Sequence, residues 1–149
     1  MTPAVREPAA VSTVHARGRI GDPDMLLLLS ANWPQRALLR PQLLHDTGED
    51  VVAVDTPADA LAWLVGAVVD LVVLDTQRLA PDAALLSALE AHRQPVVVVT
   101  GPLDQARWSS NWSNLDIRAV LVRPVFIGDV SRACQVVLPH PTPARQRSG

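Results

Sequence analysis

The chain has 149 residues, a length that suits one domain with a substantial core. Hydrophobic residues make up 48% of it and the net charge is −2, which excludes a wholly disordered chain and argues against a broad nucleic-acid or anionic-membrane surface. The single cysteine, Cys134, cannot form an internal disulfide, so a reducing, cytoplasmic setting is expected. No apolar run approaches the ~20 residues that a membrane-spanning helix needs.

Three segments differ in pattern. Residues 1–24 and 139–149 are rich in Pro, Ala and Arg and lack apolar periodicity, so they are expected to be disordered tails. Residues 25–138 carry the apolar runs and helical patterns of a folded domain. The prediction is therefore one domain with a tail at each end.

Five short runs of apolar residues in the folded part alternate with segments of helical periodicity. The expected strands cover 25–29, 51–54, 71–74, 96–99 and 119–122, and the expected helices cover 34–44, 57–68, 81–92, 103–114 and 127–138. Nearly continuous apolar strands are typical of a parallel sheet covered on both faces. The sequence predicts a three-layer, flavodoxin-like α/β fold, with five parallel strands in the order 2-1-3-4-5 and five helices.

Some details of the helices are less regular. Pro41 should kink the first helix or force one of its ends to be redrawn. The run Ser109-Ser110-Asn111 is poor in helix formers, so the fourth helix is the weakest. The second helix should start behind a capping Thr56. Its expected apolar face consists of Leu61, Leu64, Val65 and Val68.

Polar side chains close three of the expected strands. Asp75 follows the third strand, Thr100 the fourth and Arg123 the fifth. Because the strands are expected to be parallel, an acid, a hydroxyl and a cation should meet at one edge of the sheet, where open α/β sheets place their sites.

This set resembles the receiver domains of two-component response regulators. The similarity rests on Asp70-Leu71-Val72-Val73-Leu74-Asp75, Asp82, Thr100, Arg123-Pro124 and Asp59-Ala60-Leu61. The resemblance implies that Asp75 holds the phosphoacceptor position, that Arg123 replaces the lysine of the family, and that the bond before Pro124 is cis. It also implies a histidine kinase as phosphodonor and Mg²⁺ as cofactor in members that are phosphorylated.

The first strand departs from the family, which places two acidic metal ligands at its end. Here Ser30, Ala31 and Asn32 follow it, and none carries a carboxylate. Mg²⁺ prefers oxygen ligands that include carboxylates, so only a weak magnesium possibility remains at Asp75. Arg123 differs from the usual lysine in shape and is expected to pair with Asp75 directly.

Two further departures concern the family's loop and switch. The turn after Asp75 lacks the expected glycine, and Val120 stands where the family has an aromatic switch residue. Dinucleotide, phosphate-loop and nucleophile-elbow motifs are absent from the sequence. The prediction is an atypical or pseudo-receiver: a non-enzymatic protein-interaction module in signal transduction, independent of phosphorylation and without a cofactor.

Two alternatives stay open. The chain could be a single-domain response regulator that accepts phosphate on Asp75 from a histidine kinase, with Mg²⁺ needed only in that case. It could also be a small-molecule sensor that uses the crevice beside the first strand, where Trp33 would stack on a ligand or cover the vacant metal position.

The expected partner is another protein or a second copy of the chain, bound through the fourth helix, fifth strand and fifth helix. Interface candidates are Trp108, Trp112 and Val120. The two tryptophans are four residues apart and should share one side of the fourth helix, where they would either bury against the sheet or anchor a partner. Trp63 should be half exposed, and Asp82 is either a helix cap or a remnant of the family motif. No nucleic-acid or membrane partner is expected.

Overall fold

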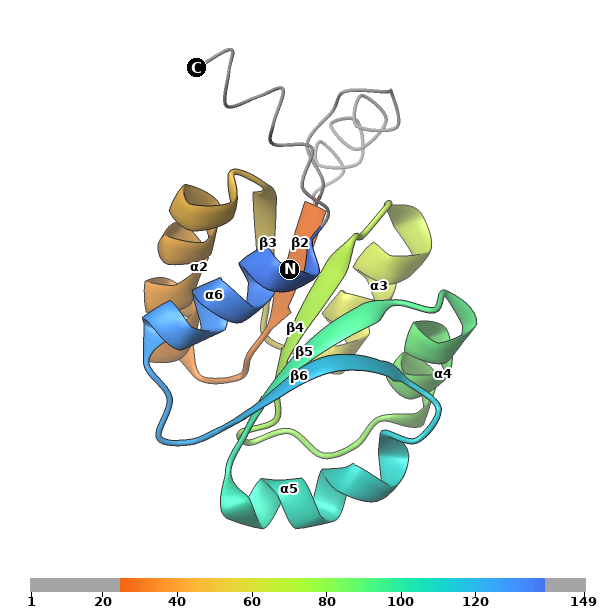
Figure 1. The fold of residues 1–149 in the computed structure, drawn as a ribbon. Coiled ribbons are helices and arrows are strands. Elements are labelled where there is room, and N and C mark those ends of the chain that lie inside the picture. Colours follow the sequence, from red (N-terminus) through yellow and green to blue (C-terminus); the bar gives the residue numbers. More distant parts are fainter. Residues whose placement is uncertain (1–24, 139–149) are drawn as a thin grey trace.

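A five-stranded parallel sheet lies at the centre of the protein, with helices on both faces (Figure 1). The computed structural model describes residues 25–138, and the two predicted tails lie outside the described residues. The strands follow one another across the sheet in the order β3-β2-β4-β5-β6, which is 2-1-3-4-5 in chain order. The flavodoxin-like fold expected from the sequence is confirmed.

The strands match the apolar runs of the sequence with small differences at their ends. They are β2 (Met25–Leu29), β3 (Asp50–Val54), β4 (Leu71–Asp75), β5 (Pro95–Thr100) and β6 (Asp116–Val122). The largest difference is at β6, which starts three residues before the predicted strand. Its first half is missed because charged Asp116 and Arg118 lie on this edge strand, and so it carries no continuous apolar run.

The helices are α2 (Trp33–Thr47), α3 (Pro57–Gly66), α4 (Ala83–Ala91), α5 (Pro102–Trp108) and α6 (Ile127–Val137), with a short 3₁₀ helix, η1 (Ser109–Asn111). Side chains cap three of them, and the sequence pattern indicates two of these caps, Thr56 and Asp82. The cap of α2 is Asn32, the cap of α3 is Thr56, and the cap of α4 is Asp82, whose Oδ1 accepts from the amide of Leu85 at 2.9 Å.

The first helix has other ends than expected. It runs from Trp33 to Thr47 with Pro41 inside it, so the redrawn end that this proline allowed is observed. Leu39 and Leu43 on either side of the proline are fully buried against the sheet. The expectation for the fourth helix is corrected. The predicted helix 103–114 stops at Trp108 and continues only as η1. The serines and asparagine there favour local hydrogen bonds over a regular helix.

The face of α3 also differs from the prediction. Ala60 and Leu64 are buried, whereas Val65 and Val68 are 72% and 61% exposed. Val68 lies beyond the end of the helix at Gly66. Because α3 is apolar on nearly all sides, periodicity alone could not identify the face that packs.

The two faces of the sheet carry separate cores. On one face, strand residues such as Leu26 and Leu28 pack with Leu39 and Leu43 of α2 and with Cys134 of α6. On the other face, the cluster includes Leu27, Leu29, Leu64, Leu85 and Trp108, which come from β2, α3, α4 and α5. The central strands β2, β4 and β5 are therefore buried on both faces, and their polar end residues lie at the carboxyl edge of the sheet.

Candidate functional site

Asp75 is the centre of a polar cluster at the carboxyl edge of the sheet. It is the last residue of β4 and is fully buried. The guanidinium of Arg123, just after β6, forms an ion pair with Asp75 through Nη2 and Oδ1. The amide of Arg123 also donates to the carbonyl oxygen of Thr100 at 2.7 Å, which fixes the start of the loop after β6. The direct pair expected from the sequence is present.

The remaining bonds of Asp75 come from its two neighbouring loops. The hydroxyl of Ser30 donates to Oδ2 at 2.9 Å, and the amide of Gln77 donates to Oδ1 at 3.0 Å. Both oxygens of the buried carboxylate are therefore committed to donors of this chain, one of them a cation. A buried carboxylate is stable when it is paired and hydrogen-bonded in this way.

The loop between β2 and α2 supplies the neutral side of the cluster. Ser30 is buried and its carbonyl oxygen accepts from Nη1 of Arg36 at 2.7 Å. Ala31 is half-buried and packs at the border of the core on the α3 and α4 face. Asn32 caps α2 through Oδ1 and donates through Nδ2 to Oε1 of Gln77 at 2.8 Å. These contacts join the loop after β2 to the loop after β4.

Thr100 is buried at the end of β5, and its hydroxyl partners the hydroxyl of Thr76 at 2.8 Å. Thr76 also lies 3.5 Å from Oδ2 of Asp104, near the start of α5. Thr76, Gln77 and Arg36 are members of the cluster that the sequence pattern did not indicate. The first two directly follow Asp75, so their position after a strand end was the available signal, whereas Arg36 is reached only through the turn of α2.

The loop after Asp75 is a tight turn without glycine. Arg78 has φ 64°, and the amide of Leu79 donates to the carbonyl oxygen of Thr76 at 3.0 Å. A left-handed conformation is uncommon for a residue with a side chain and costs roughly 1–2 kcal/mol. The indole of Trp108 donates to the carbonyl oxygen of Leu79 at 3.1 Å, which ties this turn to α5. The bond between Arg123 and Pro124 is cis, as expected.

The residues around Asp75 do not fit a magnesium ion. Asp75 is the single carboxylate in direct contact with Ser30, Gln77 and Arg123, and the cationic group that faces it is the guanidinium. Within residues 25–138, no group of three His, Cys, Asp or Glu residues lies close enough to hold a metal. A hard divalent cation needs several oxygen ligands, and the guanidinium already neutralises the one carboxylate present.

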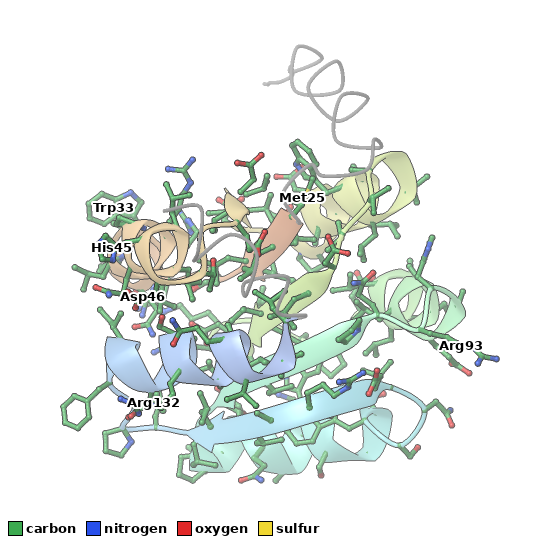
Figure 2. The ribbon with its side chains drawn as sticks, turned by 45° about the horizontal axis from the view of Figure 1, so that its top comes forward. Met25, Trp33, His45, Asp46, Arg93 and Arg132 are labelled. Atoms are coloured by element: carbon green, nitrogen blue, oxygen red, sulfur yellow. The ribbon has the colours of Figure 1, made fainter. Side chains whose placement is uncertain are left out.

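The tryptophans occupy different surroundings. Trp108 is completely buried and cannot reach a partner, so its burial against the sheet replaces the interface alternative. Trp112 follows η1 and is half-buried against the same core cluster, so the two do not share one exposed helix side. Trp63 is half-buried, as expected. Trp33 is 67% exposed at the start of α2 and projects outward (Figure 2).

Val120 is the interface candidate that stays accessible, with 37% of its surface exposed. It borders a groove of about 420 Å³ between β6 and α6. The groove is lined by Val120, Leu121, Val122, Pro124, Val125, Asp129, Arg132, Ala133 and Val136. This accessible apolar surface therefore lies on the outer edge of the sheet.

No protein-family model matches the chain, and no curated protein matches it. Solved structures do. A response regulator receiver protein from Sinorhizobium medicae WSM419 is 25% identical, with a TM-score of 0.62, and the match covers 78% of this chain and 94% of that one. The signal receiver domain of an HD domain-containing protein from Pseudomonas fluorescens Pf-5 is 19% identical, with a TM-score of 0.65 and coverage of 85% and 99%.

A CheY-like receiver domain protein from Methanospirillum hungatei JF-1 is 19% identical, with a TM-score of 0.57 and coverage of 85% and 98%. Nearly the whole length of each of these domains is matched. The chain therefore has the fold of CheY-like response-regulator receiver domains. Within residues 25–138, none of the helices has the length and apolar character needed to cross a membrane.

Proposed function

We propose that this protein is an atypical receiver that acts in signal transduction by binding another protein, without an enzymatic activity and independently of phosphorylation. The observation that carries the proposal is the enclosure of Asp75. Its carboxylate is fully buried, and the donors that surround it are Arg123, Ser30 and the amide of Gln77.

Phosphoryl transfer to a carboxylate needs an oxygen that is free to attack and a cation that neutralises the incoming charge. In this site Oδ1 is held by a guanidinium and an amide, and Oδ2 by a hydroxyl. If Asp75 bonded to a phosphoryl group instead, Arg123 and Ser30 would lose the carboxylate as their acceptor and would need new hydrogen-bond acceptors. The residues that follow β2, which are Ser30, Ala31 and Asn32, supply no carboxylate to recruit Mg²⁺. The proposed function therefore needs no metal. The location that suits this role is the cytoplasm.

The test is intact-mass measurement of the purified protein after incubation with acetyl phosphate and Mg²⁺. The expected result is no added phosphate. A matched variant, Ser30→Asp with Arg123→Lys, returns an acid to the first strand and a compact cation to the fifth, and it should gain phosphate that a further Asp75→Asn substitution removes. Phosphate on Asp75 of the unaltered protein would overturn the proposal.

A phosphorylatable single-domain regulator is the second candidate. The observation in its favour is the placement of Asp75, Thr100 and Arg123 at three strand ends. In that case Arg123 would leave Asp75 and bind the phosphoryl group. A phosphodonor kinase would then add phosphate to the native chain but not to Asp75→Asn, which separates the two candidates.

A further inference from the structure

The outer side of α2 is apolar along the length of the helix. The exposed residues that make up this outer strip recur at helical spacing and are Trp33, Pro34, Ala37, Leu38, Pro41 and Leu44. Within the structure of residues 25–138, Trp33, Leu38 and Leu44 are 67%, 57% and 44% exposed. The inner side of the same helix buries Leu39 and Leu43. A helix that is apolar on both sides is typical of one that is also covered on both sides.

The polar side chains of α2 find partners elsewhere in the fold. Arg36 donates to a backbone carbonyl of the loop after β2, and Arg40 donates to a backbone carbonyl of β3. Gln42 donates to Asp46 at 2.7 Å, and Asp46 also accepts from Ser131 of α6. These bonds hold the polar side chains at the flanks of the helix, so the outer strip suits an apolar occupant.

The outer strip is only one helix wide, which bears on the kind of occupant. α2 has 15 residues, so the strip is about 22 Å long and about 10 Å wide. Two separate proteins that form a stable complex each bury about 800 Å², several times the area of the strip. A segment of the same chain needs less contact, because its tether holds it near the strip at an effective concentration in the millimolar range. The size of the strip therefore favours a tethered occupant.

The chain before Met25 starts close to the end of α2. Met25 pairs with Asp50 across β2 and β3, and α2 ends at Thr47, three residues before Asp50 (50 − 47). About seven extended residues span the length of the outer strip. The segment of residues 1–24 is therefore long enough to reach the strip and to run along all of it.

Composition separates the two segments that lie outside the described residues. Residues 139–149 contain no Val, Leu, Ile, Met or aromatic residue. Residues 1–24 contain five larger apolar residues, which are Met1, Val5, Val11, Val14 and Ile20. So few apolar residues cannot form a core of their own, so they need another surface to be buried. An apolar strip therefore suits the first segment and not the second.

A second apolar surface near the start of β2 is smaller. The amide of Met25 donates to Oδ2 of Asp70 at 3.0 Å, and α3 ends at Gly66, four residues before Asp70 (70 − 66). Val65 and Val68 are 72% and 61% exposed there. Residues 1–24 could reach these two valines as easily as α2, but two valines offer less apolar surface than the outer strip.

We infer that residues 1–24 lie along the outer strip of α2 in the same chain and bury it. Val11 and Val14, in the middle of the segment, pack against Leu38 near the middle of the strip. This contact goes beyond the proposed function and does not depend on it. While the segment is in place, another protein can bind the outer side of α2 only by displacing it.

Photo-cross-linking of the full chain tests the inference. Leu38→Cys carries a benzophenone maleimide on the outer strip, and Cys134 stays unlabelled because it is fully buried. After irradiation and digestion, mass spectrometry should find the cross-link on residues 1–24 of the same chain. Val65→Cys is the matched control, since a segment that samples the whole surface would reach both positions. Far-ultraviolet circular dichroism checks that both labelled variants fold.

The outcomes of this experiment are distinct. Cross-links to residues 1–24 that come mainly from Leu38→Cys support the inference. A cross-link to residues 139–149, a cross-link between two chains, or no cross-link from Leu38→Cys would each overturn it. Equal cross-links to residues 1–24 from both labelled positions would overturn it as well.

A second set of variants changes the segment and leaves α2 intact. Val11→Asp with Val14→Asp should remove most of the cross-link from Leu38→Cys, because two carboxylates would have to be buried against apolar side chains. Thr2→Asp with Thr13→Asp adds the same charge at polar positions and should keep the cross-link. An unchanged cross-link in the valine variant would contradict the proposed burial. None of these results bears on phosphate uptake by Asp75, so the proposed function is tested separately.

Discussion

The indole nitrogen of Trp108 donates a hydrogen bond to the carbonyl oxygen of Leu79, and this contact joins the end of α5 to the turn that follows Asp75. At its other end the same turn is held by the pair of hydroxyls from Thr76 and Thr100. The turn is thus fastened to α5 through Leu79 and to β5 through Thr76. Movement of the loop beside Asp75 would have to break one of these bonds or carry α5 with it.

Trp108→Phe should lower the free energy of unfolding by about 1–3 kcal/mol, because the carbonyl of Leu79 loses its partner in a buried place. Urea denaturation followed by circular dichroism measures this change. Trp33→Phe is the control, and since Trp33 is 67% exposed it should alter stability by less than about 0.5 kcal/mol. Equal effects of the two substitutions would contradict the role assigned to Trp108.

Arg123→Met should lower the free energy of unfolding by about 3–5 kcal/mol, since it leaves the buried carboxylate of Asp75 without its cation. Adding Asp75→Asn should recover part of that loss, because the uncompensated charge is removed. Urea titrations of the wild type, both single variants and the double variant give the coupling energy. A double variant no more stable than Arg123→Met would show that the pair is not the origin of the loss.

Asp46 should make the free energy of unfolding depend on pH in the acid range. Hydrogen bonds from the Ser131 hydroxyl and the Gln42 amide, and the neighbouring His45, lower the pKa of Asp46 from 3.8 to about 2 (Figure 2). Ser131 lies on α6, so its bond of 2.6 Å joins α6 to α2. Because the pKa of Asp46 is lower in the folded chain than in the unfolded chain, ionised Asp46 stabilises the fold. This contribution to the free energy of unfolding is full above about pH 5 and is lost as the pH falls through 2.

Asp46→Asn should therefore be less stable than the wild type at neutral pH, with the difference shrinking between about pH 4 and pH 2. Thermal denaturation across this range measures it. Ser131→Ala, which removes the first cause of the shift, should flatten the same dependence. A difference between wild type and Asp46→Asn that stays constant down to pH 2 would rule out this linkage.

Cys134 should be unreactive in the folded protein. It is fully buried in α6, and burial raises the pKa of its thiol to about 12. At pH 8 very little thiolate is present, and the thiolate is the reactive form. Ellman's reagent should detect no thiol in the native chain and one after denaturation. Rapid reaction without loss of structure would contradict the buried placement.

The strands and their order were predictable because each strand is a short apolar run and each crossover has helical length. The ion pair of Asp75 with Arg123 was also predictable, since both residues close parallel strands and no acid competes for the arginine. The hydrogen bond between Thr76 and Thr100 was not predictable, because the conformation of the turn after Asp75 decides whether the two hydroxyls meet. The burial of Trp108 likewise depends on where α5 stops, and propensity does not give that end point accurately.

The place of β2 inside the sheet has a consequence for the assembly of the chain. Leu26 pairs with Val51 on one side and with Leu71 on the other, so the second partner follows 45 residues later in the sequence (71 − 26). Until β4 has been synthesised, the five apolar residues of β2 can complete only half of their ladder. Folding is expected to be slow for a chain of this size, because the pairing of β2 with β4 joins residues that are far apart in the sequence. During synthesis the apolar strand β2 therefore stays exposed until β4 is available.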